Sequence, residues 1–167
     1  MLLSRTSEYA LQALVYLATQ PPGRAVLNRD VARHLGVPAP YLTKILKHLV
    51  QGGLATSHKG RGGGYWLAPG AEAASIRQVV ELVEGRGTFE GCLLGLKVCA
   101  DATACPVHHA WSPMKARVLA LLEERTIGGM ALAVQRGEYR ITPPPPPPGS
   151  RRRGGHPGTR RGHPKGN

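Results

Sequence analysis

The sequence has few acidic and few aromatic side chains, and it has no long apolar run. Its 167 residues include 10 Asp and Glu against 22 Lys and Arg, with a single phenylalanine. The longest apolar stretch near the N-terminus, 10–18, is interrupted by Gln12 and falls short of the roughly 20 residues that span a bilayer. It also does not resemble a signal peptide. We therefore expect a cytoplasmic protein with no membrane partner, and the hydrophobic content of 41% is enough for the core of one domain.

Cysteine is also scarce, and its distribution is uneven. The chain has three cysteines, Cys92, Cys99 and Cys105, and all lie within fourteen positions. An odd count in a reducing compartment argues against a disulfide framework. The gaps of six and five residues are too irregular for the paired C-x-x-C knuckles of a structural zinc site, but they suit a loop folded around a cluster. The pattern indicates metal ligands or redox thiols, and three thiolates leave one coordination position open.

The positive charge is divided between a body and a tail. The formal net charge is +12, and the segment 141–167 carries six Lys or Arg and no acid. This segment contains six consecutive prolines and no apolar periodicity, so it is predicted to be disordered, with weak and salt-sensitive affinity for nucleic acid at most. The body keeps the other half of the excess charge, which is compatible with a polyanionic partner.

Helix signals dominate the first sixty-eight residues. A first helix is predicted after a cap at Thr6 or Ser7 and ends before "QPPG". Asn28 is predicted to cap a short helix, "NRDVARHL", which Gly36 terminates. Pro40 suits the first turn of a third helix. Two helices joined by a tight glycine-containing turn indicate a helix-turn-helix.

The third helix and the segment after it form a candidate DNA interface. Two apolar rows of the helix are predicted to face the core: Tyr41, Leu42, Ile45, Leu46, Leu49 and Val50. Thr43, Lys44 and Lys47 then point outward. The next segment, "LATSHKGRGGGYWLA", predicts a hairpin with Lys59 and Arg61 at its glycine-rich tip. In such a winged helix, Thr43 and Lys44 reach base edges in the major groove, while Lys59 and Arg61 reach phosphates or the minor groove.

Three segments together resemble one protein family. "SEYALQALVYLA", "YLTKILKHLVQGGL" and "GRGGGYWLA", followed by the three-cysteine loop, are similar to the Rrf2 family of bacterial transcriptional regulators from about Ser4 to Ala133. The resemblance implies a non-enzymatic, homodimeric winged-helix protein that binds a partly palindromic operator in double-stranded DNA. It also implies an iron–sulfur cluster on the three cysteines that sets DNA affinity. Repression is taken as the mode of action, and activation is left open.

The second half predicts how a dimer forms. Ser75 and Gly85 bound a short amphipathic helix, and the cysteine loop follows it. Apolar residues then recur at spacings of four, three, four and three: Val107, Trp111, Met114, Val118 and Leu121. Such a stripe packs lengthwise on a partner or back on its own domain, and the resemblance favours a partner. Pro113 predicts a kink, or a restart of the helix at Ser112.

Three residues are candidates for the fourth ligand. His108 is favoured because position i+3 of a helix lies on the face of Cys105. The resemblance adds Glu8, since related regulators complete the cluster with an acidic residue near the start of the partner's first helix. In the alternative interpretation Glu8 only interacts favourably with the helix dipole. His109 ranks behind both. A [2Fe–2S] cluster, a [4Fe–4S] cluster and zinc all fit this donor set, and iron–sulfur is our first choice.

The sequence thus predicts a mainly α fold with a small β-wing. Its predicted parts are a winged helix-turn-helix domain with a following short helix at 1–84, a cysteine-rich cluster-binding loop at 85–108, a dimerisation helix and C-terminal helical segment at 109–140, and the tail at 141–167. The predicted function is a homodimeric transcriptional regulator that senses redox state, nitric oxide or iron–sulfur status. The alternatives are a zinc-bound or metal-free thiol-switch regulator and, less favoured, a basic electron-transfer protein.

Overall fold

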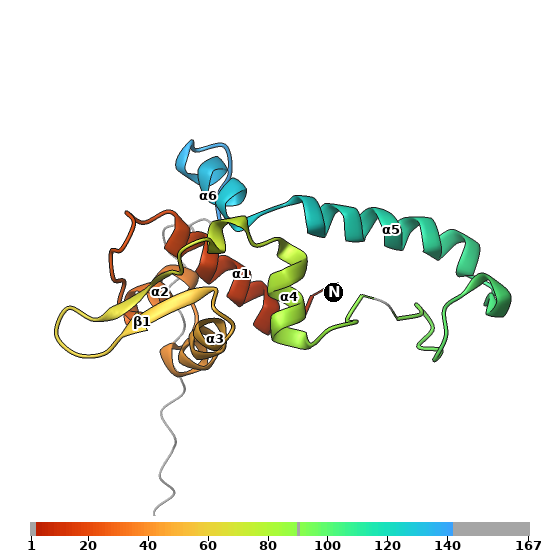
Figure 1. Ribbon diagram of the computed structural model, residues 1–167, viewed down its shortest axis with the longest axis horizontal. Coiled ribbons are helices and arrows are strands. Elements are labelled where there is room, and N and C mark those ends of the chain that lie inside the picture. Colours follow the sequence, from red (N-terminus) through yellow and green to blue (C-terminus); the bar gives the residue numbers. More distant parts are fainter. Residues whose placement is uncertain (1–2, 90, 142–167) are drawn as a thin grey trace, which may run out of the picture.

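The computed structural model describes residues 3–89 and 91–141, and it confirms a mainly α fold with a small wing (Figure 1). Its helices are α1 (Arg5–Ala18), α2 (Asn28–Leu35), α3 (Ala39–Gln51), α4 (Ile76–Glu84), α5 (His108–Glu124) and α6 (Ile127–Gln135). The two strands are β1 (Ala55–His58) and β2 (Gly64–Leu67), and short 3-10 turns cover Ala71–Ala73 and Asp101–Thr103. In the described part of the chain, no helix is long and apolar enough to cross a membrane.

The core lies around α1, which packs against α2, α3, α4 and α6. The largest fully buried apolar side chains come from all of these helices: Leu14, Val31, Leu42, Leu46, Leu49, Val79, Val80 and Ile127. Burying each one stabilises the fold by about 1.5–3 kcal/mol. On α3 the predicted inward rows are buried or half-buried, and Thr43, Lys44 and Lys47 are exposed. The core therefore fixes which face of α3 is free to meet a partner.

Two helix starts differ from the predictions. The cap of α1 is Ser4, whose hydroxyl accepts from the backbone N–H of Ser7, and not Thr6 or Ser7 themselves. Asn28 does not cap α2: it is already the first helical residue, because the chain arrives extended at Leu27. Its side chain reaches across to α3 instead. The predicted end of α2 is confirmed, since Gly36 closes the helix in the left-handed conformation at φ 68°.

The hairpin is fixed firmly at its base. Strands β1 and β2 pair antiparallel, with Ala55 opposite Leu67 and His58 opposite Gly64. Val26 and Tyr65 exchange two backbone hydrogen bonds of 2.9 and 2.8 Å, which tie the hairpin to the loop before α2. The tip turns through glycines with positive φ, as the sequence predicts. The wing is therefore held beside the helix-turn-helix while its tip projects from the body (Figure 1).

Helix α5 extends away from the body and packs against α4 (Figure 1). Its C-terminal end is anchored by two backbone hydrogen bonds of 2.9 Å, from Ile76 to the carbonyl of Arg125 and from Ile127 to the carbonyl of Ala74. The predicted restart at Ser112 is wrong, because α5 runs continuously from His108 to Glu124 through Pro113. Pro113 removes one backbone donor without ending the helix. The N-terminal end of α5, with the cysteine loop before it, thus lies far from the core.

The chain after α6 returns to the core before the predicted tail begins. Ile141 is half-buried and packs against the core cluster. Ile141, the first residue of the predicted tail at 141–167, therefore belongs to the folded body. The remainder of that prediction lies outside the described residues.

Candidate functional site

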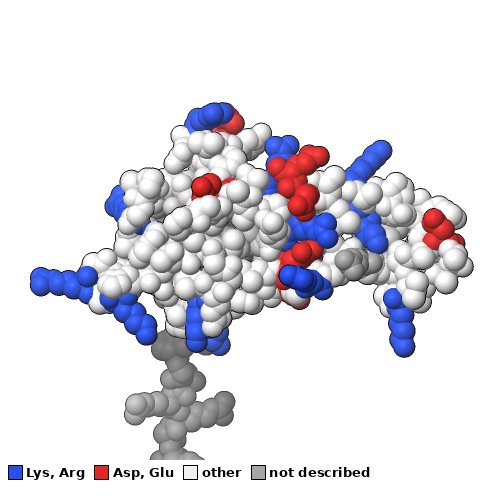
Figure 2. Space-filling model, viewed as in Figure 1, with Lys and Arg blue, Asp and Glu red and all other residues white. Residues whose placement is uncertain are grey.

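Five polar side chains predicted to meet DNA lie on the exposed face of α3 and at the hairpin tip. Thr43, Lys44 and Lys47 are exposed along α3, and Lys59 and Arg61 are exposed at the tip. Figure 2 shows Lys and Arg projecting from the hairpin end, while acidic side chains gather near the middle of the molecule. Within residues 3–89 and 91–141, none of the ion pairs involves any of these four cations. Their charges are available to phosphates.

We expect the hairpin tip to contribute DNA affinity without sequence preference. Replacing Lys59 and Arg61 together by alanine should weaken binding to every duplex, roughly tenfold at low salt, because both cations displace counterions from phosphates. The slope of log affinity against log salt should fall by about 0.9 for each phosphate that is no longer neutralised. Gel-shift titrations at two salt concentrations measure both quantities. Unchanged affinity at both concentrations would exclude the wing as a DNA-binding element.

The three cysteines lie near one another in the loop between α4 and α5. All three are free thiols and half-buried. Backbone hydrogen bonds from Leu94 and Leu96 lower the pKa of Cys92; burial opposes this effect, and hydrogen bonds with Cys105 and Cys99 add to it. A thiol with a lowered pKa carries more thiolate, which is the form that binds metal or reacts. The loop thus favours ionised sulfur at Cys92.

His108 is buried beside this cluster of thiols. The residue is 4% exposed, its Nδ1 lies 3.6 Å from Cys99 Sγ, and its Nε2 lies 2.8 Å from Asp101 Oδ1. The spacing predicts that the side chain of His108 lies beside Cys105. In the structure the backbone N–H of His108 donates to the Cys105 carbonyl, while the ring faces Cys99. His109 is exposed, and its ring packs edge-to-face against the ring of His108.

Asp101 is the residue of this site that the sequence interpretation missed. A carboxylate that binds one imidazole nitrogen fixes the tautomer and leaves the other nitrogen for a ligand. Here Asp101 engages Nε2 of His108, so Nδ1 is the nitrogen turned towards the thiols. The available signal was an acidic residue inside a loop that already held three cysteines and preceded a histidine.

Three thiols and one buried imidazole nitrogen form the donor set of this loop. In the described part of the chain, no three His, Cys, Asp or Glu side chains converge as ligands of one metal ion. The sulfurs nevertheless lie close enough for Cys92 to interact with both other thiols, and His108 supplies a buried nitrogen at the edge of the group. Thiolates and an imidazole nitrogen are donors that zinc and iron–sulfur clusters both accept.

Glu8, the alternative fourth ligand, lies in the first turn of α1. Its carboxylate pairs with Arg5 at 3.0 Å and is half-buried. No hydrogen bond or ion pair among the described residues joins Glu8 to the cysteine loop of its own chain. A ligand role for Glu8 therefore depends on a partner subunit.

The first turn of α1 connects the start of the cysteine loop to α3. Glu84, the last residue of α4, accepts from the Ser7 hydroxyl and, at 3.1 Å, from the backbone N–H of Ser4. In the same turn the Thr6 hydroxyl bonds to the Tyr41 hydroxyl of α3 at 2.9 Å. Two hydrogen-bonded contacts, Ser7 with Glu84 and Thr6 with Tyr41, therefore link the beginning of the loop to the N-terminal end of α3.

The Glu84 contact predicts an acid-sensitive part of the stability. Burial opposes ionisation of Glu84, but hydrogen bonds from Ser7 and Ser4 outweigh it, so its pKa lies below the ordinary value. A lowered pKa stabilises the fold above the unfolded-state pKa, and this contribution is lost as pH falls from about 4.5 through the folded pKa. Glu84→Gln should therefore destabilise the protein at pH 7 and do so less at pH 4, and because Glu84 is exposed, solvent screening keeps the effect below about 1 kcal/mol.

Urea unfolding at the two pH values measures this difference. Glu138→Gln is the matched control, because Glu138 is exposed like Glu84 but, among the described residues, its carboxylate makes only a 3.9 Å ion pair with Arg136. An equal effect of Glu84→Gln at both pH values would show that the carboxylate charge does not matter to the contact.

A helix-turn-helix with a basic wing and an exposed face on its third helix is the architecture of many DNA-binding transcriptional regulators. The chain matches the profile of the Rrf2 family, described as an iron-dependent transcriptional regulator, over residues 3–132. It therefore belongs to the Rrf2 family. The resemblance seen in the wing glycines and the cysteine loop is confirmed.

Named relatives agree with this assignment. The chain is 37% identical over 134 residues to the predicted HTH-type transcriptional regulator Rv1287 of Mycobacterium tuberculosis, covering 78% of this chain and 81% of that protein. It is 28% identical over 132 residues to the HTH-type transcriptional regulator IscR of Vibrio cholerae, covering 79% and 76%.

Solved structures share the fold. The structure of IscR from T. potens matches with a TM-score of 0.65 at 22% identity, over 83% of this chain and 91% of that one. CymR, the global cysteine regulator of B. subtilis, matches with a TM-score of 0.64 at 20% identity, over 78% and 95%. At these identities the match supports the winged-helix architecture alone.

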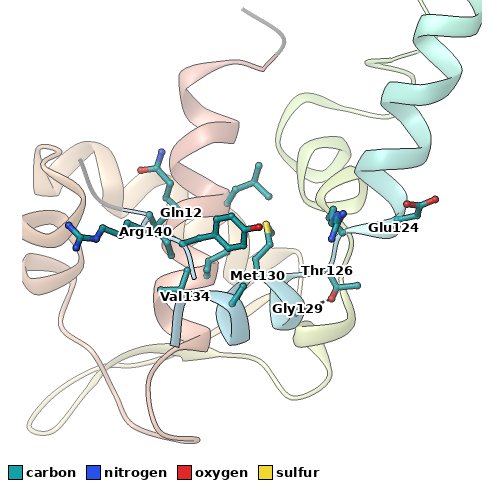
Figure 3. Close-up of a pocket in the computed structure, with 13 residues that line it drawn as sticks. Gln12, Glu124, Thr126, Gly129, Met130, Val134 and Arg140 are labelled. Carbon is teal, nitrogen blue, oxygen red and sulfur yellow. Dashed lines mark hydrogen bonds between the residues drawn. The ribbon is translucent and has the colours of Figure 1, made fainter. Parts of the chain in front are cut away.

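One surface pocket lies apart from both candidate sites. It is lined by α1, the junction of α5 and α6, α6 and the segment that follows α6, with Gln12, Met130 and Arg140 among its side chains (Figure 3). None of the candidate DNA-binding or metal-binding residues lines it.

Proposed function

We propose that this protein is a cytoplasmic, homodimeric Rrf2-type regulator whose operator binding is modulated by an iron–sulfur cluster on Cys92, Cys99 and Cys105. The observation that carries the proposal is the gathering of all three thiols of the chain beside the buried His108. The family description as iron-dependent regulators supports iron over zinc. The operator is a partly palindromic duplex, because a two-fold dimer presents two copies of α3.

His108 is the fourth ligand in this proposal, through Nδ1. Asp101 holds the ring by Nε2 and keeps the other nitrogen directed at the thiols. Glu8 of the partner subunit is the alternative, and its first-turn position on α1 leaves it available once its pair with Arg5 is broken. An iron–sulfur cluster in this loop would supply a redox centre open to attack by oxidants and nitric oxide. A replaceable non-sulfur ligand leaves one side of the site open to such molecules.

The dimer is proposed to form along α5. This 17-residue helix stands away from the body, and its buried residues are only His108 and Leu122. On its apolar stripe, Met114 is 59% exposed and Leu121 is 51% exposed. A long helix with an uncovered stripe of large apolar side chains is typical of a helix that packs on a second copy. The predicted parts of the chain keep their roles in this proposal: 1–84 binds DNA, 85–108 holds the cluster and 109–140 supplies the dimer contacts.

The contacts of α1 give the proposed regulation a physical route. A cluster on the three cysteines would restrain the loop that follows Glu84, and Glu84 itself bonds to Ser4 and Ser7. Thr6 and Tyr41 extend this contact to the N-terminal end of α3. Release of the loop changes the restraint on Glu84 and so shifts the population of α3 placements in the dimer. The expected consequence is a change in operator affinity or preference.

The absorption spectrum of anaerobically purified protein tests the cofactor. Broad visible bands, with iron and acid-labile sulfide in the same preparation, are expected for an iron–sulfur cluster. A colourless protein that contains zinc would favour a zinc-bound regulator. A colourless protein free of metal would favour a thiol switch, and either colourless outcome overturns the cluster proposal.

A further inference from the structure

The hydroxyl of Thr43 is already engaged within the fold. It donates its single hydrogen to the backbone carbonyl of Ala39 at 2.9 Å, and it accepts from Asn28 Nδ2 at 2.8 Å. The same Nδ2 donates to the Ala39 carbonyl at 3.1 Å. Thr43 nevertheless is exposed on the outward face of α3. Because the hydroxyl of Thr43 faces Ala39 and Asn28, the methyl group is the part of the Thr43 side chain that is available for contact with a partner.

We infer that Thr43 recognises thymine through its methyl group and that Asn28 is the positioning residue that holds it in this orientation. A hydroxyl without a free hydrogen cannot donate to the acceptors of guanine, adenine or thymine in the major groove. A methyl group, by contrast, packs against the C5-methyl of thymine, which no other DNA base carries unmodified. This inference rests on the proposed contact of α3 with DNA and is independent of the cluster.

The chemistry of Asn28 supports a positioning role. Because the Ala39 carbonyl can only accept, the nitrogen of the Asn28 amide must be the atom that faces it, and the orientation of the amide is thereby fixed. The other amide atom, Oδ1, is buried and finds no partner among the described residues. A buried acceptor without a partner is unfavourable for folding. What ties Asn28 to α3 is therefore its nitrogen, and one of the two hydrogen bonds of this nitrogen ends on the Thr43 hydroxyl.

The test uses duplexes that the wild-type protein selects from a random library. In the selected sequence, each thymine of one half-site is replaced in turn by deoxyuridine, which removes only the C5-methyl. At one position the wild-type affinity should fall about fourfold, the expected value for one buried carbon. If no thymine of the half-site responds to the replacement, the inference is wrong. If no sequence is enriched at all, sequence-specific DNA binding fails as well, so the two failures are distinguishable.

Variants of Thr43 separate its methyl from its hydroxyl. Thr43→Val keeps a methyl facing outward and should retain the fourfold preference for thymine over deoxyuridine. Thr43→Ser keeps the hydroxyl contacts but lacks the methyl, so its preference should fall to about one. A serine variant that keeps the full preference would overturn the methyl contact.

Asn28→Ala tests the positioning role through the same preference. It should lower the thymine preference below twofold, because Thr43 then samples other rotamers, while affinity for unselected DNA stays unchanged. Arg33→Ala is the control on the same helix, since Arg33 is exposed and pairs only with Asp30. It should keep the full preference. Circular dichroism confirms that each variant is folded, and an unchanged preference in folded Asn28→Ala would overturn the role of Asn28.

Discussion

Serine in place of Cys92, Cys99 or Cys105 is expected to remove most of the visible absorption of the anaerobic protein, by roughly tenfold or more for each single substitution. Each thiolate anchors iron, and a serine oxygen is a poor soft ligand. The effect should be similar at all three positions, because the chain has no fourth cysteine to replace a missing one. Iron and sulfide content should fall in parallel with the absorption.

The non-sulfur ligands provide the matched comparison. His108→Ala should retain a cluster with shifted absorption and faster decay in oxygen or nitric oxide, because water or an added thiol can take the vacated place. Glu8→Ala is the parallel test of a ligand from the partner subunit. The winged helix contains neither the cysteines nor His108, so these variants should keep native helix content and dimerise. Full absorption in any single cysteine variant would contradict its role as a ligand.

Two glutamates on the apolar stripe of α5 are expected to dissociate the dimer. Met114→Glu with Leu121→Glu places carboxylates where two copies of α5 are proposed to pack, and the dissociation constant should rise at least about 100-fold. Binding to a two-half-site operator should fall by a similar factor, since one subunit then holds one half-site. Sedimentation velocity at micromolar concentration measures the change in mass.

The control for this substitution lies on the same helix. Ala116→Glu adds a carboxylate at an exposed position away from the stripe and should leave the dimer intact. If the stripe variant stays dimeric and folded, α5 is not the interface and its apolar residues serve another contact.

Local patterns were sufficient for most of the DNA-binding domain. The two apolar rows of α3, the left-handed Gly36 and the glycine-rich tip each depend on a few neighbouring residues, and the structure places them as predicted. The start of α1 was not predictable in this way. Ser4, Thr6 and Ser7 are all able to cap a helix, and the choice among them involves Glu84, a residue nearly eighty positions away.

The cysteine loop shows the same limit. Spacing alone placed His108 near Cys105, but α5 begins at His108 itself, so its ring leaves the first turn towards Cys99. The role of Asp101 depends on the path of an irregular loop, for which no periodicity exists in the sequence. The role of Asn28 was misjudged for a related reason, because its partners lie on a different helix.

Operator affinity in the cluster-loaded and cluster-free states is the most direct test of the regulation. The wild-type dimer, titrated anaerobically against its selected operator before and after removal of iron, should show two distinct affinities or two distinct sequence preferences. The variant with serine at Cys92, Cys99 and Cys105 should bind with the cluster-free value under both conditions. If this triple variant instead matched the loaded wild type in both affinity and preference, the cysteine loop would have no regulatory role and the account would be contradicted.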